Sequence, residues 1–159
     1  MSIEERLDEL EQRLLAAEDQ LEIIRLLNTY GPAVDSASGK PASELWTENG
    51  SYNPGGTFVK TGRAQIEHMY SSDTHQRLVH TGVSHLTATP RITLHGDTAE
   101  AVAYSYVILK RDEEWMIWRA AINHFTLART PEGWRIVERF NRVLDGSEDS
   151  HDTMRKGLV

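Results

Sequence analysis

The chain has 159 residues, of which 39% are hydrophobic and 26% charged, and it contains no cysteine. This length suits a single domain with a continuous core, and the lack of cysteine excludes disulfides, thiolate metal sites and a cysteine nucleophile. No run approaches the roughly 20 apolar residues that span a bilayer, and the acidic N-terminus does not match a secretory signal. We therefore expect a cytoplasmic protein with no membrane partner.

The net charge of −7 is concentrated in one segment. Residues 1–22 hold eight acidic and two basic side chains, so the other 137 residues carry a net charge of only −1. The acidic balance argues against a nucleic-acid partner, because nucleic acids favour a basic surface. The total charge therefore says little about a substrate.

The acidic segment is expected to form a helix that ends at Gly31-Pro32. Ser2 and Glu5 form a capping box at its start. Apolar residues then follow in steps of four and three, the spacing of a short coiled coil, at Ile3, Leu7, Leu10, Leu14, Ala17, Leu21 and Ile24. Residues 1–17 could lie on their own domain or project as an arm that pairs with another subunit. In both arrangements we expect the acidic face to be solvated.

The rest of the chain is expected to place helices before strands. Residues 42–46 could form one or two helical turns, a Pro-Gly-Gly turn between Tyr52 and Phe58 suggests a hairpin, and residues 62–71 suggest a second helix. From Leu78 onward the pattern is strand-like, with β-rich runs at 83–94, 98–110, 114–128 and 134–144.

This order indicates an α+β fold in which helices cover one face of a curved antiparallel sheet around a pocket. No repeat or linker divides the chain, so residues 1–144 are expected to form a single domain. Residues 145–159 are polar, and we expect a loosely ordered tail there.

Three histidines recur at intervals of five residues, at His75, His80 and His85. This spacing fits neither one helix face nor one strand face, and no His-x-Glu pattern accompanies it, so no metal site is predicted. The sequence also contains no nucleotide-binding glycine loop and no nucleophile elbow. The remaining option is acid–base chemistry without a cofactor.

Asp35 and His85 are the candidates for that chemistry. Asp35 follows the expected helix end, and His85 lies in a strand-like run. A carboxylate that accepts a hydrogen bond from one imidazole nitrogen fixes the tautomer and leaves the other nitrogen as a base. Spacing alone does not bring the two together, and each could instead be an ordinary turn or strand residue.

Several short motifs occur in an order that resembles a known family. The acidic helix runs into Tyr30, and Asp35 follows it and precedes Glu44-Leu45-Trp46. Gly62 opens the next helix. His85 is followed by Thr89-Pro90, a strand and a Gly-Asp-x-Ala turn, before a last hairpin with Gly-Trp. Together they resemble the SnoaL-like branch of the nuclear transport factor 2-like superfamily. Its members include scytalone dehydratase, bile-acid 7α-dehydratase, hexachlorocyclohexane dehydrochlorinase, polyketide cyclases and the β subunits of ring-hydroxylating dioxygenases.

The resemblance implies a cone, in which a strongly bent antiparallel sheet and N-terminal helices enclose a hydrophobic pocket. In the lyase members an aspartate and a histidine remove a proton and a tyrosine assists the substrate oxygen, and these roles would fall on Asp35, His85 and Tyr30. Arg129 matches a position where dehydrochlorinase-like members carry an arginine. The bile-acid dehydratase has a further aspartate where this chain has Tyr106 and no acid, so that substrate is not expected.

The expected substrate-binding residues are Tyr52, Asn123, Phe125 and Arg129. Strand alternation places the last three on one face, expected to be concave, and points His124 the other way.

We expect a cofactor-independent lyase or isomerase that acts on a small hydrophobic cyclic substrate. The alternative is a non-catalytic ligand-binding or assembly subunit of the dioxygenase β type. The resemblance also implies a homodimer or homotrimer. Trp115, Met116 and Trp118 would lie either at the subunit interface or in the core.

Overall fold

The computed structural model describes residues 1–56 and 58–158. Its helices are α1 (Ile3–Asp35), α2 (Gly39–Ser43), α3 (Arg63–Ser71), α4 (Asp73–Thr81) and α5 (Glu148–Arg155), followed by a short 3-10 helix, η1 (Lys156–Leu158). Its strands are β1 (Trp46–Asn53), β2 (Lys60–Thr61), β3 (Val83–Thr87), β4 (Arg91–His95), β5 (Thr98–Arg111), β6 (Glu114–Thr130) and β7 (Gly133–Val143). No helix in the described ranges is long and apolar enough to cross a membrane.

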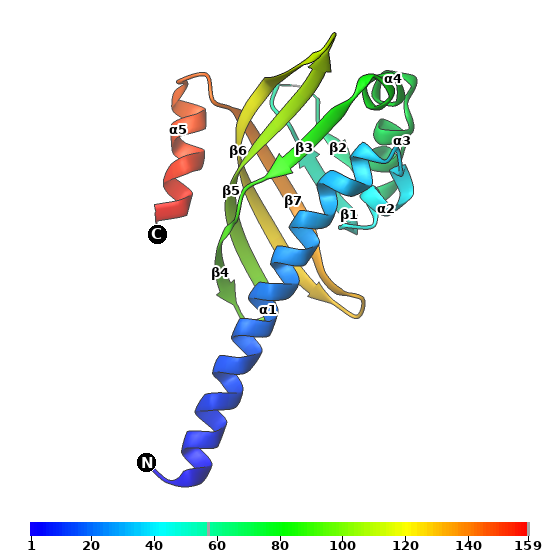
Figure 1. Ribbon diagram of the computed structural model, residues 1–159. Coiled ribbons are helices and arrows are strands. Elements are labelled where there is room, and N and C mark those ends of the chain that lie inside the picture. Colours follow the sequence, from blue (N-terminus) through cyan, green and yellow to red (C-terminus); the bar gives the residue numbers. More distant parts are fainter. Residues whose placement is uncertain (57, 159) are drawn as a thin grey trace.

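The expected α+β fold is confirmed. The described strands form one sheet in the order β2-β1-β7-β6-β5-β3, and β4 also pairs with β5. Figure 1 shows the sheet strongly curved, with α1 across one face and α5 on the other side. The sheet is mixed rather than purely antiparallel, because β1 runs parallel to β7.

The core lies between α1 and the curved sheet. Residues spaced by three and four along α1 are buried there, at Ile23, Leu27, Tyr30 and Val34. The same buried cluster contains Ala99, Ala101 and Ala103 of β5. Such small side chains leave space for larger groups of α1 and of the neighbouring strands on this face.

The expected end of α1 at Gly31-Pro32 is wrong. The helix includes Pro32 and continues to Asp35, and Ser36 donates its backbone N–H to the Pro32 carbonyl at 3.1 Å. A proline inside a helix removes one backbone donor, but here only one turn follows. Burial of Val34 in the core supports that last turn.

The acidic face of α1 is not entirely solvated, contrary to expectation. Asp19 accepts hydrogen bonds from Arg129 Nη2 at 2.7 Å and from Trp134 Nε1 at 3.0 Å. Glu22 accepts the backbone N–H of Trp134 at 3.1 Å. These contacts fix the middle of α1 to the β6–β7 turn.

The middle of the chain agrees with the sequence in part. The hairpin is confirmed, since β1 pairs with β2 at Ser51 and Thr61, and so is the helix over 62–71, as α3. The short helix begins earlier than expected, as α2, and Trp46 belongs to β1. The strand-like interpretation from Leu78 is wrong, because α4 extends to Thr81.

The expected loose order of the C-terminal tail is also wrong over residues 147–158, and residue 159 lies outside the described residues. Ser147 caps α5 by accepting the backbone N–H of Ser150 at 3.3 Å. Ser150 and Thr153 are buried, and in η1 a side-chain carbon added at Gly157 would lie 3.2 Å from Val102 of β5. The polar composition of this segment did not indicate α5, which packs on the sheet.

Candidate functional site

Asp35 and His85, separated by 50 residues in sequence, are in direct contact. Asp35 Oδ1 lies 2.5 Å from His85 Nδ1, and Asp35 Oδ2 accepts the His85 backbone N–H at 2.7 Å. A carboxylate can only accept, so Nδ1 carries the proton of the neutral ring. Nε2 is then the nitrogen that can take a proton. The continuation of α1 past Pro32 places Asp35 beside β3.

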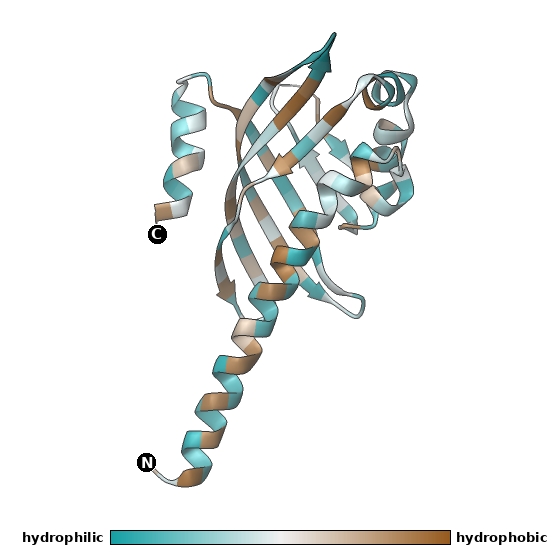
Figure 2. Ribbon diagram, in the orientation of Figure 1, coloured by the Kyte–Doolittle hydropathy of each residue, from teal (hydrophilic) through white to brown (hydrophobic). Residues whose placement is uncertain are grey.

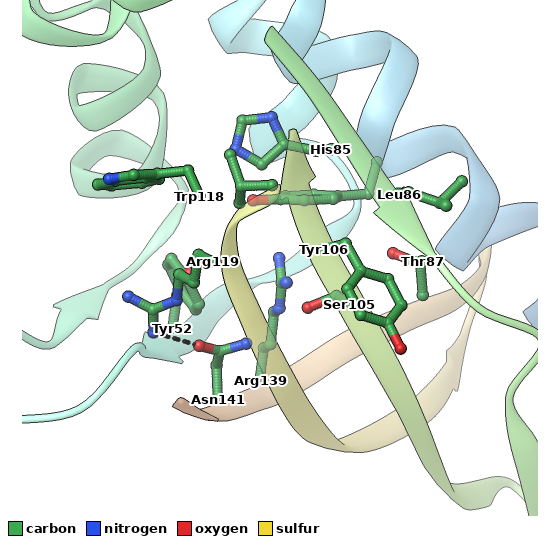
Figure 3. A pocket seen from close by; sticks show the side chains of 12 residues that line it. Tyr52, His85, Leu86, Thr87, Ser105, Tyr106, Trp118, Arg119, Arg139 and Asn141 are labelled. Atoms are coloured by element: carbon green, nitrogen blue, oxygen red, sulfur yellow. Dashed lines mark hydrogen bonds between the residues drawn. The ribbon is translucent and has the colours of Figure 1, made fainter. Parts of the chain in front are cut away.

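His85 lines a small inner cavity of about 140 Å³. Figure 3 shows this cavity between β3, β5, β6 and β7, with Arg119, Arg139 and Asn141 on the side opposite His85. Tyr30, Tyr52 and Ser105 also line it. The inner cavity is polar, so the expected hydrophobic character does not hold there.

A larger and more open cavity of about 830 Å³ shares five lining residues with the inner one: His85, Tyr30, Tyr52, Trp118 and Arg119. The surface of its lining is mostly apolar, with Pro54, Phe58, Met69 and Leu78, although Lys60, His68 and His75 also reach it. The hydrophobic character expected from the resemblance is therefore found in this outer part. His85 lies where the two cavities meet.

Tyr30 is buried next to the dyad. Its ring lies edge-on to the His85 ring at a centroid distance of 5.9 Å, and its hydroxyl is 3.0 Å from the hydroxyl of Tyr70. Burial raises the pKa of Tyr52, and it raises the pKa of Tyr70 well above the ordinary value. Both hydroxyls therefore stay protonated at neutral pH and can donate hydrogen bonds.

Arg139 is a site residue that the sequence interpretation missed. It is 4% exposed, lines the inner cavity, and its guanidinium carbon lies 4.2 Å from the Tyr30 ring centre and 4.9 Å from that of Tyr52. Burial acts to lower the pKa of Arg139, but the surrounding tyrosine oxygens outweigh it and the pKa lies above its ordinary value. The group is a buried cation.

Asn123 holds Arg139 in place. The Asn123 Oδ1 atom accepts from Arg139 Nε at 2.9 Å and from Asn141 Nδ2 at 2.7 Å, while Nδ2 donates to Ser105 Oγ at 2.8 Å. Arg119 Nη2 donates to Asn141 Oδ1 at 2.6 Å. One network therefore connects the two guanidinium groups.

The other expected substrate-binding residues fall in different places. Tyr52 lines both cavities. Asn123 and Phe125 share the concave face as expected but are buried beneath Arg139, with the Phe125 ring centre 5.6 Å from its guanidinium carbon. Arg129 is outside the site, because its guanidinium binds Asp19 and Asp97.

His124 points to the opposite sheet face, as alternation predicts, where its Nε2 is 3.0 Å from Glu100. The three histidines spaced by five have separate partners. His75 Nε2 is 2.9 Å from the Val34 carbonyl, His80 Nδ1 is 2.6 Å from the Gln76 carbonyl, and His85 binds Asp35. Among residues 1–56 and 58–158, no group of three or more His, Asp or Glu side chains is placed to hold a metal ion.

Several solved structures are similar to this chain. A nuclear transport factor 2-like protein with a cystatin-like fold from Novosphingobium aromaticivorans shares 37% identity over 93% of this chain and 96% of that one, with a TM-score of 0.90. A protein of unknown function from Mycobacterium tuberculosis shares 21% identity, covering 94% and 90% of the two chains, with a TM-score of 0.74. A candidate aromatic ring hydroxylase from N. aromaticivorans shares 22% identity, covering 80% and 90%, with a TM-score of 0.65.

The last two likenesses are too distant in sequence to show more than the fold. No curated protein matches the chain. The sequence pattern of the SnoaL-like domain matches residues 15–140, which include the dyad, Arg139 and every residue that lines the two cavities except Asn141. The chain therefore belongs to the SnoaL-like family of the nuclear transport factor 2-like superfamily.

Proposed function

We propose that the protein is a cofactor-independent lyase of the dehydratase type, or an isomerase, that acts on a small cyclic substrate. The observation that carries the proposal is the pair of contacts between Asp35 and His85, which leaves Nε2 as the free base of a ring that lines both cavities. The family includes dehydratases, and its fold alone does not determine the reaction.

In this reaction His85 Nε2 takes a proton from a carbon next to a carbonyl group. The C–H electron pair forms a new double bond, and in a dehydration the hydroxyl on the neighbouring carbon leaves as water after it receives a proton from the imidazolium. In an isomerisation the imidazolium returns the proton to a different carbon. Asp35 stabilises the imidazolium that forms between the two transfers.

Tyr30 polarises the substrate carbonyl in this proposal. If Tyr70 donates to the Tyr30 oxygen across their 3.0 Å contact, the Tyr30 proton is free to point to the substrate. The raised pKa of Tyr70 keeps that donor protonated. Tyr70 thus acts as a positioning residue through Tyr30.

The test is turnover of a panel of cyclic hydroxy-ketones and enones. We expect His85→Ala and Asp35→Asn each to lower kcat by about 10²–10⁴-fold, the usual contribution of a positioned acid or base. His151→Ala is the matched control, because that histidine is exposed on α5 and lines neither cavity. Turnover that survives both dyad substitutions would exclude His85 as the base.

A homo-oligomeric assembly subunit is the second candidate function. Ile3, Leu7, Leu10 and Leu14 of α1 are each more than half exposed, and this part of α1 extends beyond the sheet in Figures 1 and 2. Trp115, Met116 and Trp118 are also exposed, which excludes them from the core of this chain. The heptad spacing on α1 fits pairing with a second copy of the same helix.

Sedimentation of the chain with and without residues 1–17 tests the assembly. We expect the full chain to sediment as a homodimer or homotrimer, and the shortened chain to sediment at a lower mass. An unchanged oligomer would exclude the arm as the contact, and would leave the surface around Trp115 as the remaining candidate.

A further inference from the structure

The inner cavity is lined by positively charged side chains, although the chain as a whole has a net negative charge. Arg119 and Arg139 line it, and none of its lining residues is an aspartate or glutamate. Neither arginine forms an ion pair with a carboxylate anywhere in residues 1–56 and 58–158. The net charge of −7 therefore describes the surface, while the cavity is cationic.

Arg139 has an unused hydrogen-bond donor. Its Nε donates to Asn123, but its Nη1 is buried and has no acceptor among the described residues. Burial of a cation without an anionic partner is unfavourable, and so is burial of an unpaired donor on that cation. The rings of Tyr30 and Tyr52 offset part of this through cation–π contacts.

Arg119 also binds only neutral acceptors. Its Nη2 donates to the Pro54 carbonyl at 3.1 Å and to Asn141 Oδ1 at 2.6 Å. Through Asn141 and Asn123 it is held in fixed relation to Arg139, as Figure 3 shows for the Arg119–Asn141 bond. Two guanidinium groups held in place by neutral amides form a preorganised anion site.

We propose that the substrate carries a carboxylate, which binds in the inner cavity against Arg139 and Arg119. This inference rests on the proposed function, because it places that group opposite His85 in the same cavity. A volume of about 140 Å³ accommodates roughly one six-membered ring. The carboxylate and the adjoining ring thus fill the inner cavity, and further apolar parts of the substrate extend into the outer one.

The carboxylate supplies what Arg139 lacks. One of its oxygens accepts from Nη1, and its charge balances the guanidinium in a site largely shielded from water. The hydroxyls of Tyr52 and Ser105 line the same cavity and can donate to the second oxygen. The bound carboxylate fixes the orientation of the substrate ring, so that the C–H bonds of the ring lie toward His85.

The experiment compares benzoate with benzamide, which has nearly the same shape and no charge, by isothermal titration calorimetry. For the unaltered protein we expect benzoate to bind about tenfold more tightly or better, the factor that corresponds to about 1.4 kcal/mol. Arg139→Met should reduce this preference to within about twofold, and Arg119→Gln should reduce it partly. Arg77→Gln is the control, because it removes the same charge from an exposed position on α4.

A second measurement needs no substitution and so does not depend on whether a variant folds. The guanidinium N–H resonances of Arg139 should shift when benzoate is added, and should shift much less with the same concentration of benzamide. Inorganic phosphate serves as a further probe, and a response to phosphate as strong as that to benzoate would overturn the assignment to a carboxylate. Equal affinity for benzoate and benzamide, no binding of benzoate, or a preference that persists in Arg139→Met would also overturn it.

The outcome is separable from that of the proposed function. His85→Ala should lose turnover and keep the benzoate preference, because the two guanidinium groups do not depend on the imidazole. If the benzoate preference is present and His85→Ala retains full turnover, the anion site stands and the proposed base is wrong. If turnover depends on His85 and benzoate shows no preference, the base stands and the anion site is wrong.

Discussion

Gly31 of α1 and His85 of β3 approach so closely that only a glycine fits between helix and strand. A Cβ atom added at Gly31 would lie 2.2 Å from the carbonyl oxygen of His85, well inside van der Waals contact. Asp35 follows Gly31 by four residues and therefore lies on the same face of the helix, one turn further on. The close approach at Gly31 is thus what allows the Asp35 carboxylate to reach His85.

Gly31→Ala should destabilise the protein, although alanine is the better helix former. In an exposed helix this change stabilises by about 1 kcal/mol. Here the added methyl group pushes against the β3 backbone, and overpacking of this kind typically costs about 1–3 kcal/mol. Urea unfolding followed by circular dichroism measures the sign, and a variant as stable as the parent would show that helix and strand separate freely.

The sequence was sufficient to predict the dyad residues, because they belong to motifs that the resemblance carries. It was misleading about Arg129, which is fixed by Asp19 and Asp97 on the surface. Arg139, whose guanidinium does line the cavity, could not be predicted from strand alternation because the register between β6 and β7 changes. Leu127 pairs with Ile136 and Thr126 pairs with Glu138, so Val137 has no partner on β6.

This β-bulge reverses which residues face the cavity. Trp134 and Ile136 are buried before Val137, and simple alternation from them would turn Arg139 and Asn141 away from the core. The extra residue moves both side chains to the buried face. No local sequence pattern marks the bulge, since it depends on how β6 and β7 pair.

Helix ends were the other weak point, and for a similar reason. The residues Gly31-Pro32 favour the end of a helix, but burial of Val34 in the core stabilises one further helical turn. Residues 145–159 are polar, yet Ser150 and Thr153 are buried where α5 packs on the sheet. In both places long-range packing decided the outcome over local preference.

The tautomer of His85 is directly measurable. Nitrogen NMR of the neutral ring should show Nδ1 protonated and Nε2 bare, because the Asp35 carboxylate at 2.5 Å can only accept from Nδ1. In Asp35→Asn we expect a mixture of both tautomers, since an amide can accept or donate. Asp73→Asn changes an exposed acid on α4 and should leave the spectrum unchanged. A dominant Nε2–H form in the parent protein would contradict the assigned base.

His124 should make the fold sensitive to mild acid. Burial lowers the pKa of His124 below its ordinary value of 6.5, and nearby Lys156 adds to the effect, while Glu100 opposes it. The folded state therefore binds this proton less readily than the unfolded state does. Its stabilising effect is fully present above pH 6.5 and is lost as the pH falls through the lowered native pKa.

The measurement is the urea midpoint at pH 7.5 and at successively lower values, for the parent chain and for His124→Gln. We expect the substitution to make the loss of stability below about pH 6.5 less steep, because the titrating ring is gone. His68→Gln, at an exposed position of α3, serves as the control and should follow the parent. Parallel curves for the parent and His124→Gln would refute the role of burial.

Asp19 should anchor α1 more strongly than its surface location suggests. Its carboxylate accepts from Trp134 Nε1 at 3.0 Å and from Arg129 at 2.7 Å, and Arg129 holds its pKa below the ordinary value. Trp134 is fully buried, so Asp19→Ala leaves a buried indole N–H without its acceptor. We expect a loss of about 1–3 kcal/mol at pH 7 by thermal or urea unfolding. Glu18→Ala also replaces a carboxylate by alanine, one residue earlier and at an exposed position, and it should change stability little. Equal effects of the two variants would mean that the helix is held by its apolar face alone.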